Sequence, residues 1–182
     1  NDVGEGILSN KIGKELKKFT QLDISDLDFV GTLPSEIGLL TELVCLDLGG
    51  NAFTGSVPSE IGLLTELTHL DLGGNDFTGL VLSEIWLMTE LAHLDLRGND
   101  FTGSVPSEIL LLTELTSLSL GSNSFTGSVP IELLLLPFFT GSTLSNTNVT
   151  TFLPSTIGLQ TQLTHLNLYD KSITGTLPSE IG

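Results

Sequence analysis

Aspartate, histidine and threonine recur in this sequence at intervals of 24 residues, which would place identical side chains in rows if the chain forms regular coils. One series is Asp47, Asp71 and Asp95. A second series, two residues before it, is Cys45, His69 and His93. Carboxylates in a row repel one another, which should raise some of their pKa values or attract cations. The neighbouring aspartates should in turn favour the protonated form of the histidines.

The cysteine and histidine series raises the questions of a metal site and of a nucleophile pair. Ligands in one straight row across three strands span about 10 Å, whereas zinc holds its donors at about 2.0–2.3 Å around one point. Two members of the row plus an aspartate could meet an ion, but four could not without distortion. Cys45 and His69 could pair by spacing, but an open sheet offers no visible oxyanion hole. The sequence therefore predicts no metal site, no cofactor and no enzyme activity.

Threonine forms the longest series, and a row rich in serine and threonine lies two residues after it. The series consists of Thr54, Thr78, Thr102, Thr126, Thr150 and Thr174. Such rows resemble the ladders of ice-binding proteins, in which rigid methyl and hydroxyl groups order water. Leu80 and Phe152 interrupt the second row. Ice binding is therefore an alternative function for this chain.

These intervals reflect an internal repeat that covers nearly all of the 182 residues. Seven copies align in register, at residues 16–39, 40–63, 64–87, 88–111, 112–135, 136–159 and 160–182. A fixed period of this length predicts a solenoid, in which each coil contacts only its neighbours. Residues 1–15 carry apolar side chains at helical spacing and are predicted to form an N-terminal cap.

The second copy reads LTELVCLDLGGNAFTGSVPSEIGL, with the pattern L-x-x-L-x-x-L-x-L-x-x-N-x-F-T-G-x-V-P-x-E-I-G-x. This pattern resembles the plant-type leucine-rich repeat family. The resemblance implies an α/β solenoid, a right-handed superhelix with a parallel β-sheet on its concave side and irregular or 3-10 segments on its convex side. It also implies a secreted or cell-surface protein that binds a partner, similar to extracellular receptor-like and algal domains.

Within each copy, alternating apolar residues such as Leu46 and Leu48 predict a half-buried strand. The recurring asparagine, represented by Asn75, is predicted to satisfy backbone groups at the turn after that strand. The recurring phenylalanine is predicted to form a core spine. In three successive copies large apolar residues replace glycine, namely Trp86, Leu110 and Leu134. They would form either an exposed apolar contact stripe or part of the core.

The charge balance limits the partners, with six basic against 22 acidic residues and a net charge of −16. Such a surface repels phosphate backbones, which argues against nucleic-acid binding. The longest apolar run, residues 131–139, contains Glu132 and Pro137 and is far shorter than the roughly 20 residues of a membrane helix. With one cysteine the chain has no internal disulfide, and we expect a monomer or weak dimer. Asn148 begins an N-glycosylation sequon.

The sequence favours a non-catalytic scaffold that binds a basic protein or peptide ligand on its acidic concave sheet. The residues expected to contact that partner are Asp47, His69, Asp71, His93, Asp95 and Arg97. Ice binding through the threonine rows is the alternative, and a structural spacer within a larger surface protein is a third hypothesis.

Overall fold

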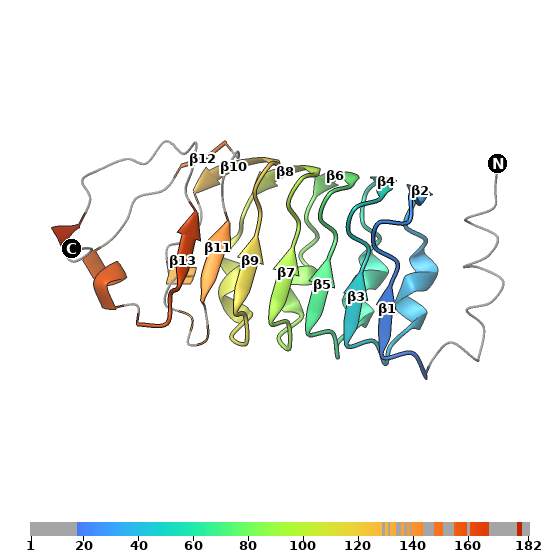
Figure 1. Ribbon diagram of the computed structural model, residues 1–182, viewed down its shortest axis with the longest axis horizontal. Coiled ribbons are helices and arrows are strands. Elements are labelled where there is room, and N and C mark those ends of the chain that lie inside the picture. The colour runs from blue at the N-terminus through green and yellow to red at the C-terminus, as the bar shows by residue number, and fades with distance from the viewer. Residues whose placement is uncertain are drawn as a thin grey trace.

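The computed structural model describes residues 18–128, 130, 132–133, 136, 138, 140–143, 148–150, 155–159, 161–167 and 178–179. The predicted cap over residues 1–15 lies outside these residues. The chain forms a stack of coils with one parallel sheet along each of two sides (Figure 1). This arrangement confirms the predicted solenoid of parallel strands.

The first sheet has seven strands, and their order in the sheet follows their order in the chain. They are β1 (Gln21–Asp23), β3 (Cys45–Asp47), β5 (His69–Asp71), β7 (His93–Asp95), β9 (Ser117–Ser119), β11 (Gly141–Thr143) and β13 (His165–Asn167). Equivalent repeat positions pair directly, so His69 lies opposite His93 and Asp71 opposite Asp95. In β3, β5, β7 and β9 the middle residue is a leucine whose side chain is at most 1% exposed, as the alternation predicts.

A second, six-stranded parallel sheet runs along the adjacent edge of the coils, just beyond the carboxyl ends of the first sheet's strands, where the sequence predicts no strands (Figure 1). Its strands are β2 (Val30–Thr32), β4 (Ala52–Gly55), β6 (Asp76–Leu80), β8 (Asp100–Ser104), β10 (Ser124–Ser128) and β12 (Asn148–Thr150). Here the paired residues are 22 positions apart, so that Leu80 and Ser124, not another threonine, lie opposite Thr102. The prediction that equivalent threonines, 24 positions apart, lie directly opposite one another in straight rows is therefore wrong.

Short 3-10 turns complete the coils between the second sheet and the next strand of the first. They are η2 (Ser35–Leu39), η3 (Ser59–Leu63), η4 (Ile85–Leu87), η5 (Ser107–Leu111) and η7 (Ser155–Leu159). Proline immediately precedes η2, η3 and η5 in an extended conformation, with φ of −70° and ψ of 144° at Pro58. Its fixed φ and missing N–H suit a residue that ends an extended segment. No helix among the described residues is long and apolar enough to span a membrane.

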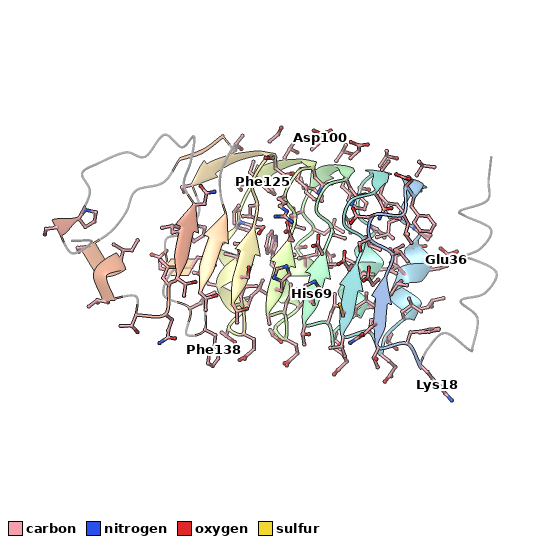
Figure 2. The ribbon with its side chains drawn as sticks, in the orientation of Figure 1. Lys18, Glu36, His69, Asp100, Phe125 and Phe138 are labelled. Atoms are coloured by element: carbon pink, nitrogen blue, oxygen red, sulfur yellow. The ribbon has the colours of Figure 1, made fainter. Side chains whose placement is uncertain are left out.

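The space between the two sheets is filled by stacked phenylalanine rings and leucines. The rings of Phe29, Phe53, Phe77, Phe101 and Phe125 stack in sequence with centroids 5.9–6.3 Å apart. Figure 2 shows Phe125 inside the coils and His69 on the seven-stranded sheet. The phenylalanine column is therefore the predicted core spine.

The recurring asparagine connects successive coils through a repeated set of hydrogen bonds. Nδ2 of Asn75 donates to the carbonyl oxygens of Leu48, Leu72 and Gly73 at 2.9–3.2 Å. Its Oδ1 accepts the N–H of Phe53 at 3.0 Å. The same pattern recurs at Asn99 and Asn123, both of which are buried. The asparagine column is structural, as predicted.

Of the three apolar residues that replace glycine, the two that the structure describes do not form an exposed stripe. Trp86 is 2% exposed and belongs to the core, Leu110 is half-buried, and Leu134 lies outside the described residues. Leu82 stands where other copies have proline, and η4 begins two residues later in its copy than η3 does. Trp86 in this shifted turn points inward, so of the two alternatives left open by the sequence, the core holds for this residue.

Candidate functional site

The acidic row runs along the seven-stranded sheet at the carboxyl ends of its strands, and each carboxylate is held by the backbone. Oδ1 of each aspartate accepts the N–H of the residue two positions later. The four bonds are Ser25 N–H to Asp23 at 3.0 Å, Gly49 N–H to Asp47 at 2.9 Å, Gly73 N–H to Asp71 at 2.7 Å and Arg97 N–H to Asp95 at 2.9 Å. Each aspartate therefore closes a turn and presents a fixed carboxylate.

Glycine lies between successive carboxylates of this row. A Cβ built on Gly49 would lie 3.2 Å from Oδ1 of both Asp47 and Asp71. One built on Gly73 would lie 3.1 Å from Oδ1 of both Asp71 and Asp95. The absence of side chains there leaves an open hollow of about 320 Å³, lined by Ser25, Asp26, Asp47, Gly49, Gly50, Asp71, Gly73, Gly74 and Arg97.

Arg97 supplies the one ion pair found among the residues that the structure describes. Its Nε lies 3.1 Å from Oδ2 of Asp95, whose side chain is 5% exposed whereas that of Arg97 is 65% exposed. Arg97 replaces the glycine of the two preceding coils, and its Cγ lies 3.4 Å from the Cβ position built on Gly73. The predicted contact residues Asp47, Asp71, Asp95 and Arg97 therefore lie side by side. We call the surface formed by these four residues with His69 and His93 the aspartate face.

Burial and neighbouring charges change the ionisation of several groups on this sheet. The pKa of Asp95 is raised, mainly because burial disfavours its charged form, and the charge of Asp71 adds to this. The pKa of the Cys45 thiol is raised by burial and then by the charge of Asp47. The pKa of Asp23, at the edge of the sheet, is lowered by hydrogen bonds from the Ser25 backbone and side chain. Repulsion along the row, expected from sequence, thus contributes at Asp95 but ranks below burial.

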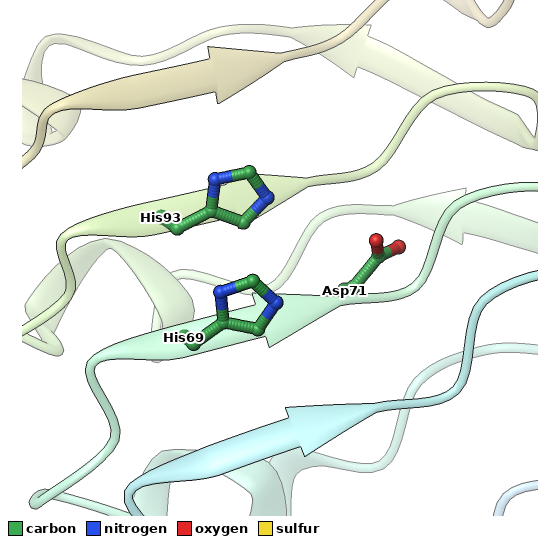
Figure 3. Close-up of side chains that lie close together, drawn as sticks. All are labelled: His69, Asp71 and His93. Atoms are coloured by element: carbon green, nitrogen blue, oxygen red, sulfur yellow. The ribbon is translucent and has the colours of Figure 1, made fainter. Parts of the chain in front are cut away.

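The two histidines stack on each other, one coil apart. The ring centroids of His69 and His93 lie 4.3 Å apart with an angle of 6° between the ring planes (Figure 3). The pKa of His93 is lowered by burial and then by His69, which together outweigh the opposing charge of Asp71. For His93 the aspartates do favour the protonated ring, as expected from sequence, but burial and the second ring outweigh them and the net shift is downward.

Asp71 lies beside this histidine pair, and the three residues can offer ligand atoms to one ion. A nitrogen of each ring and a carboxylate oxygen of Asp71 lie within 4.8 Å of one another (Figure 3). Cys45 pairs in register with His69 but does not belong to this group. The straight Cys–His–His row considered from sequence is thus replaced by a compact grouping of two histidines and one aspartate.

The threonine series occupies the second sheet, away from the aspartate face. Thr54, Thr78, Thr102 and Thr126 are exposed. The side chain of Thr150 and all of Thr174 lie outside the described residues, as does the side chain of Asn148, the predicted glycosylation site. Among the exposed threonines the register places Asp76 opposite Thr54 and Asp100 opposite Thr78, so carboxylates interrupt the rows.

Sequence reasoning missed the structural role of the aspartates. The signal for it is the spacing of aspartate and a small residue two positions later, as in Asp47 and Gly49, which is typical of side-chain turns. It also missed the second sheet, because Phe-Thr-Gly segments of about five residues lack the long alternation that predicts a strand.

Stacked coils with two open parallel sheets, one carrying an ordered polar row, define a repeat solenoid with an extended exposed surface. The chain belongs to the leucine-rich repeat family. The sequence profile described as Leucine Rich Repeat matches residues 42–64, 66–88, 90–112 and 114–136. Among curated protein sequences, none matches the chain significantly.

Several solved structures of plant receptors are similar to this chain. The plant peptide hormone receptor RGFR1 in complex with RGF2 is 33% identical over 88% of this chain and 26% of its own, with a TM-score of 0.82. The Arabidopsis receptor kinase HAESA, in complex with the peptide hormone IDA and the co-receptor SERK1, is 28% identical over 91% of this chain and 28% of its own, with a TM-score of 0.84. The chain thus spans about a quarter of the length of these receptor chains.

A plant ice-binding protein shares the fold as well. It is 24% identical over 90% of this chain and 60% of its own, with a TM-score of 0.76. At this level of identity the similarity concerns the fold alone.

Proposed function

We propose that the chain is a non-catalytic scaffold, extracellular or at the cell surface, that binds a basic peptide or protein segment on its aspartate face. The observation that carries this proposal is the hollow beside Asp47 and Asp71, whose carboxylates flank Gly49. Their Oδ1 atoms are held by backbone N–H groups, so the charges are ordered before a ligand arrives. Preorganised charge of one sign accelerates association and selects against ligands of the same sign.

The chain's own Arg97 illustrates the contact that a basic ligand would make. Its guanidinium lies at 3.1 Å from Asp95, on the coil that follows Gly73. Asp47 and Asp71 have equivalent positions on the two preceding coils, where glycine takes the place of Arg97. A lysine or arginine of the ligand would enter above Gly49 and pair with these two carboxylates.

The similarity to receptor ectodomains supports this proposal at a coarser level. The solved RGFR1 and HAESA structures are complexes with peptide hormones. They are plant receptors, which supports an extracellular or cell-surface location for this chain. The basic character of the ligand rests on the aspartate face and not on these relatives.

The test is selection of peptides that differ in lysine and arginine content, followed by surface plasmon resonance with the selected peptides. The double variant Asp47→Asn/Asp71→Asn keeps the oxygens that accept the Gly49 and Gly73 N–H groups but removes both charges. We expect it to weaken binding about ten-fold or more, with an affinity that depends less on salt. The matched control is Asp76→Asn/Asp100→Asn, which makes the same charge change on the second sheet.

Two results would contradict the proposal. One is a selection that enriches no basic peptides over neutral ones. The other is an equal loss of binding in the control variant, which would mean that net charge and not the aspartate face is recognised. A selection that yields no ligand at all, together with unchanged folding of the Asp47→Asn/Asp71→Asn variant, would favour the spacer hypothesis.

Ice binding is a second candidate, supported by the exposure of Thr54, Thr78, Thr102 and Thr126 on one parallel sheet. Thermal hysteresis and ice-crystal shape measure it directly. Thr102→Tyr places a bulky ring in the middle of this surface and should abolish the activity. Thr113→Tyr, at an exposed position before β9, is the control. Wild-type protein without hysteresis excludes this candidate.

A further inference from the structure

The histidine pair and Asp71 form a cluster within the aspartate face, and of its three side chains only the Asp71 carboxylate takes part in the proposed contact with a basic ligand. His69 and Asp71 are two residues apart on β5, so their side chains leave the same face of the sheet. His93 lies opposite His69 on β7, which brings the second ring to the same face. Figure 3 shows the two rings one above the other, with the carboxylate beside them.

We propose that His69, His93 and Asp71 form a binding site for a divalent transition-metal ion of the zinc type. One ligand atom from each of the three residues lies within 4.8 Å of the others. Two imidazoles with one carboxylate suit zinc, copper, nickel and ferrous iron, because imidazole is a ligand of intermediate softness. Calcium and magnesium prefer sets made entirely of oxygen and are expected to bind poorly here.

The side chains reach a metal geometry by small rotations, with the strands left in place. Tetrahedral donors at about 2.0–2.2 Å from zinc lie roughly 3.4 Å from one another. The observed separations of up to 4.8 Å must therefore shorten by about 1.4 Å at most. Both rings are only half-buried, and the torsion that turns an imidazole about its stem is broad.

The surroundings of Asp71 suit a metal ligand. Its Oδ1 accepts the Gly73 N–H at 2.7 Å, which orients the carboxylate and leaves Oδ2 to meet the ion. Asp47 and Asp95 flank Asp71 on the neighbouring strands and add negative potential that attracts a dication. Three protein ligands leave a coordination position for water or for a group from a partner.

The test is isothermal titration of zinc chloride into the chelator-treated full chain, in the absence of any peptide. We expect one ion per chain, with affinity reduced about ten-fold or more in His69→Ala, His93→Ala and Asp71→Asn. The control is His165→Ala, because His165 has the equivalent position in β13 but lies opposite Gly141 and not a second histidine. Circular dichroism without metal verifies that each variant is folded.

A second measurement avoids substitutions at the site. In the wild-type protein, zinc should shift the imidazole proton resonances of two histidines and leave those of the third, assigned with His165→Ala, unchanged. The proposal is overturned if zinc shows no saturable binding, if His165→Ala loses as much zinc affinity as the site variants, or if calcium displaces zinc. Because no peptide is present, failure here leaves the proposed peptide binding untouched, and loss of peptide binding leaves the metal site untouched.

Discussion

The side-chain oxygen of Asn99 accepts the backbone N–H of Phe77 at 3.0 Å, although 22 residues separate them in the chain. The amide nitrogen of Asn99 donates to the carbonyl oxygens of Leu72 and Leu96, one from the preceding coil and one from its own. One buried side chain therefore satisfies backbone groups on two coils where the strands of the first sheet end. Buried backbone groups without partners are costly, which explains why this residue recurs in four successive coils, as Asn51, Asn75, Asn99 and Asn123.

Asn99→Ala should destabilise the protein by about 3 kcal/mol, because several buried backbone groups lose their partner at once. Asn99→Asp keeps the acceptor for Phe77 but loses the donors, and should also be destabilising. Urea unfolding followed by circular dichroism measures both. The comparison is Asn51→Ala, which should cost less. Asn51 makes an equivalent set of bonds but is only half-buried, so water can replace part of what the amide provides. Equal losses at the two positions would contradict this account.

The sequence predicts those parts of the fold that depend on local repetition. The buried leucines and the direct pairing of His69 with His93 follow from a period of 24 residues and strand alternation. The offset pairing of Thr102 with Leu80 does not follow from the repeat period, because it depends on how successive strands of the second sheet shift along one another. The spacing allowed two members of the row plus an aspartate to meet an ion, but it did not identify them as His69, His93 and Asp71, because that depends on side-chain conformations.

Burial decided the outcome at two single residues for which the sequence could not. For His93 the sign of the pKa shift depends on how deeply the ring is packed, and charges inferred from sequence omit this. For Trp86 the direction of the side chain depends on a 3-10 turn whose start is moved where leucine replaces proline. Neither effect appears in the pattern of residue types.

Trp86→Ala should destabilise the protein by about 3–5 kcal/mol, because it leaves a large cavity in the core. The ring is 2% exposed and packs with the buried residues of the coils. The control is Leu87→Ala in the same turn, where the side chain is 60% exposed and the expected change is below about 0.5 kcal/mol. Thermal unfolding of the Trp86→Ala and Leu87→Ala variants measures the two stability changes. A stability change near zero for Trp86→Ala would restore the exposed-stripe hypothesis.

Gly38 has the repeat position that Trp86 has two coils later, yet it should not accept even a methyl group. A Cβ built there would lie 2.5 Å from the backbone oxygen of Glu60. Gly38→Ala should therefore destabilise the protein by about 1–3 kcal/mol, through displacement of η2 against η3. Ser59→Ala, an exposed change in η3, is the control for urea unfolding. If alanine at position 38 stabilises the protein, the turns adjust more freely than the packing implies.

Cys45 gives a chemical readout of the aspartate face through its rate of alkylation by iodoacetamide. Burial, followed by the charges of Asp47, Asp23 and Asp71, raises the pKa of the thiol above its ordinary value. Because the thiolate is the reacting form, a raised pKa lowers the rate at neutral pH, and the rate should continue to rise at pH values where that of free cysteine has levelled off. Asp47→Asn keeps the hydrogen bond from Gly49 and removes one charge, so it should accelerate alkylation at pH 8 by roughly two- to five-fold.

Two comparisons separate electrostatics from a change in access to the thiol. Asp76→Asn removes the same charge on the second sheet and should leave the rate unaltered. Raising the salt concentration should narrow the difference between wild type and Asp47→Asn, because ions screen partly exposed charges. If Asp47→Asn accelerates the reaction equally at all pH values, including those at which the thiol is fully ionised, then it has opened access to Cys45. In that case Asp47 does not act through its charge, and the ordered acidic row proposed to attract a basic ligand loses its electrostatic basis at this coil.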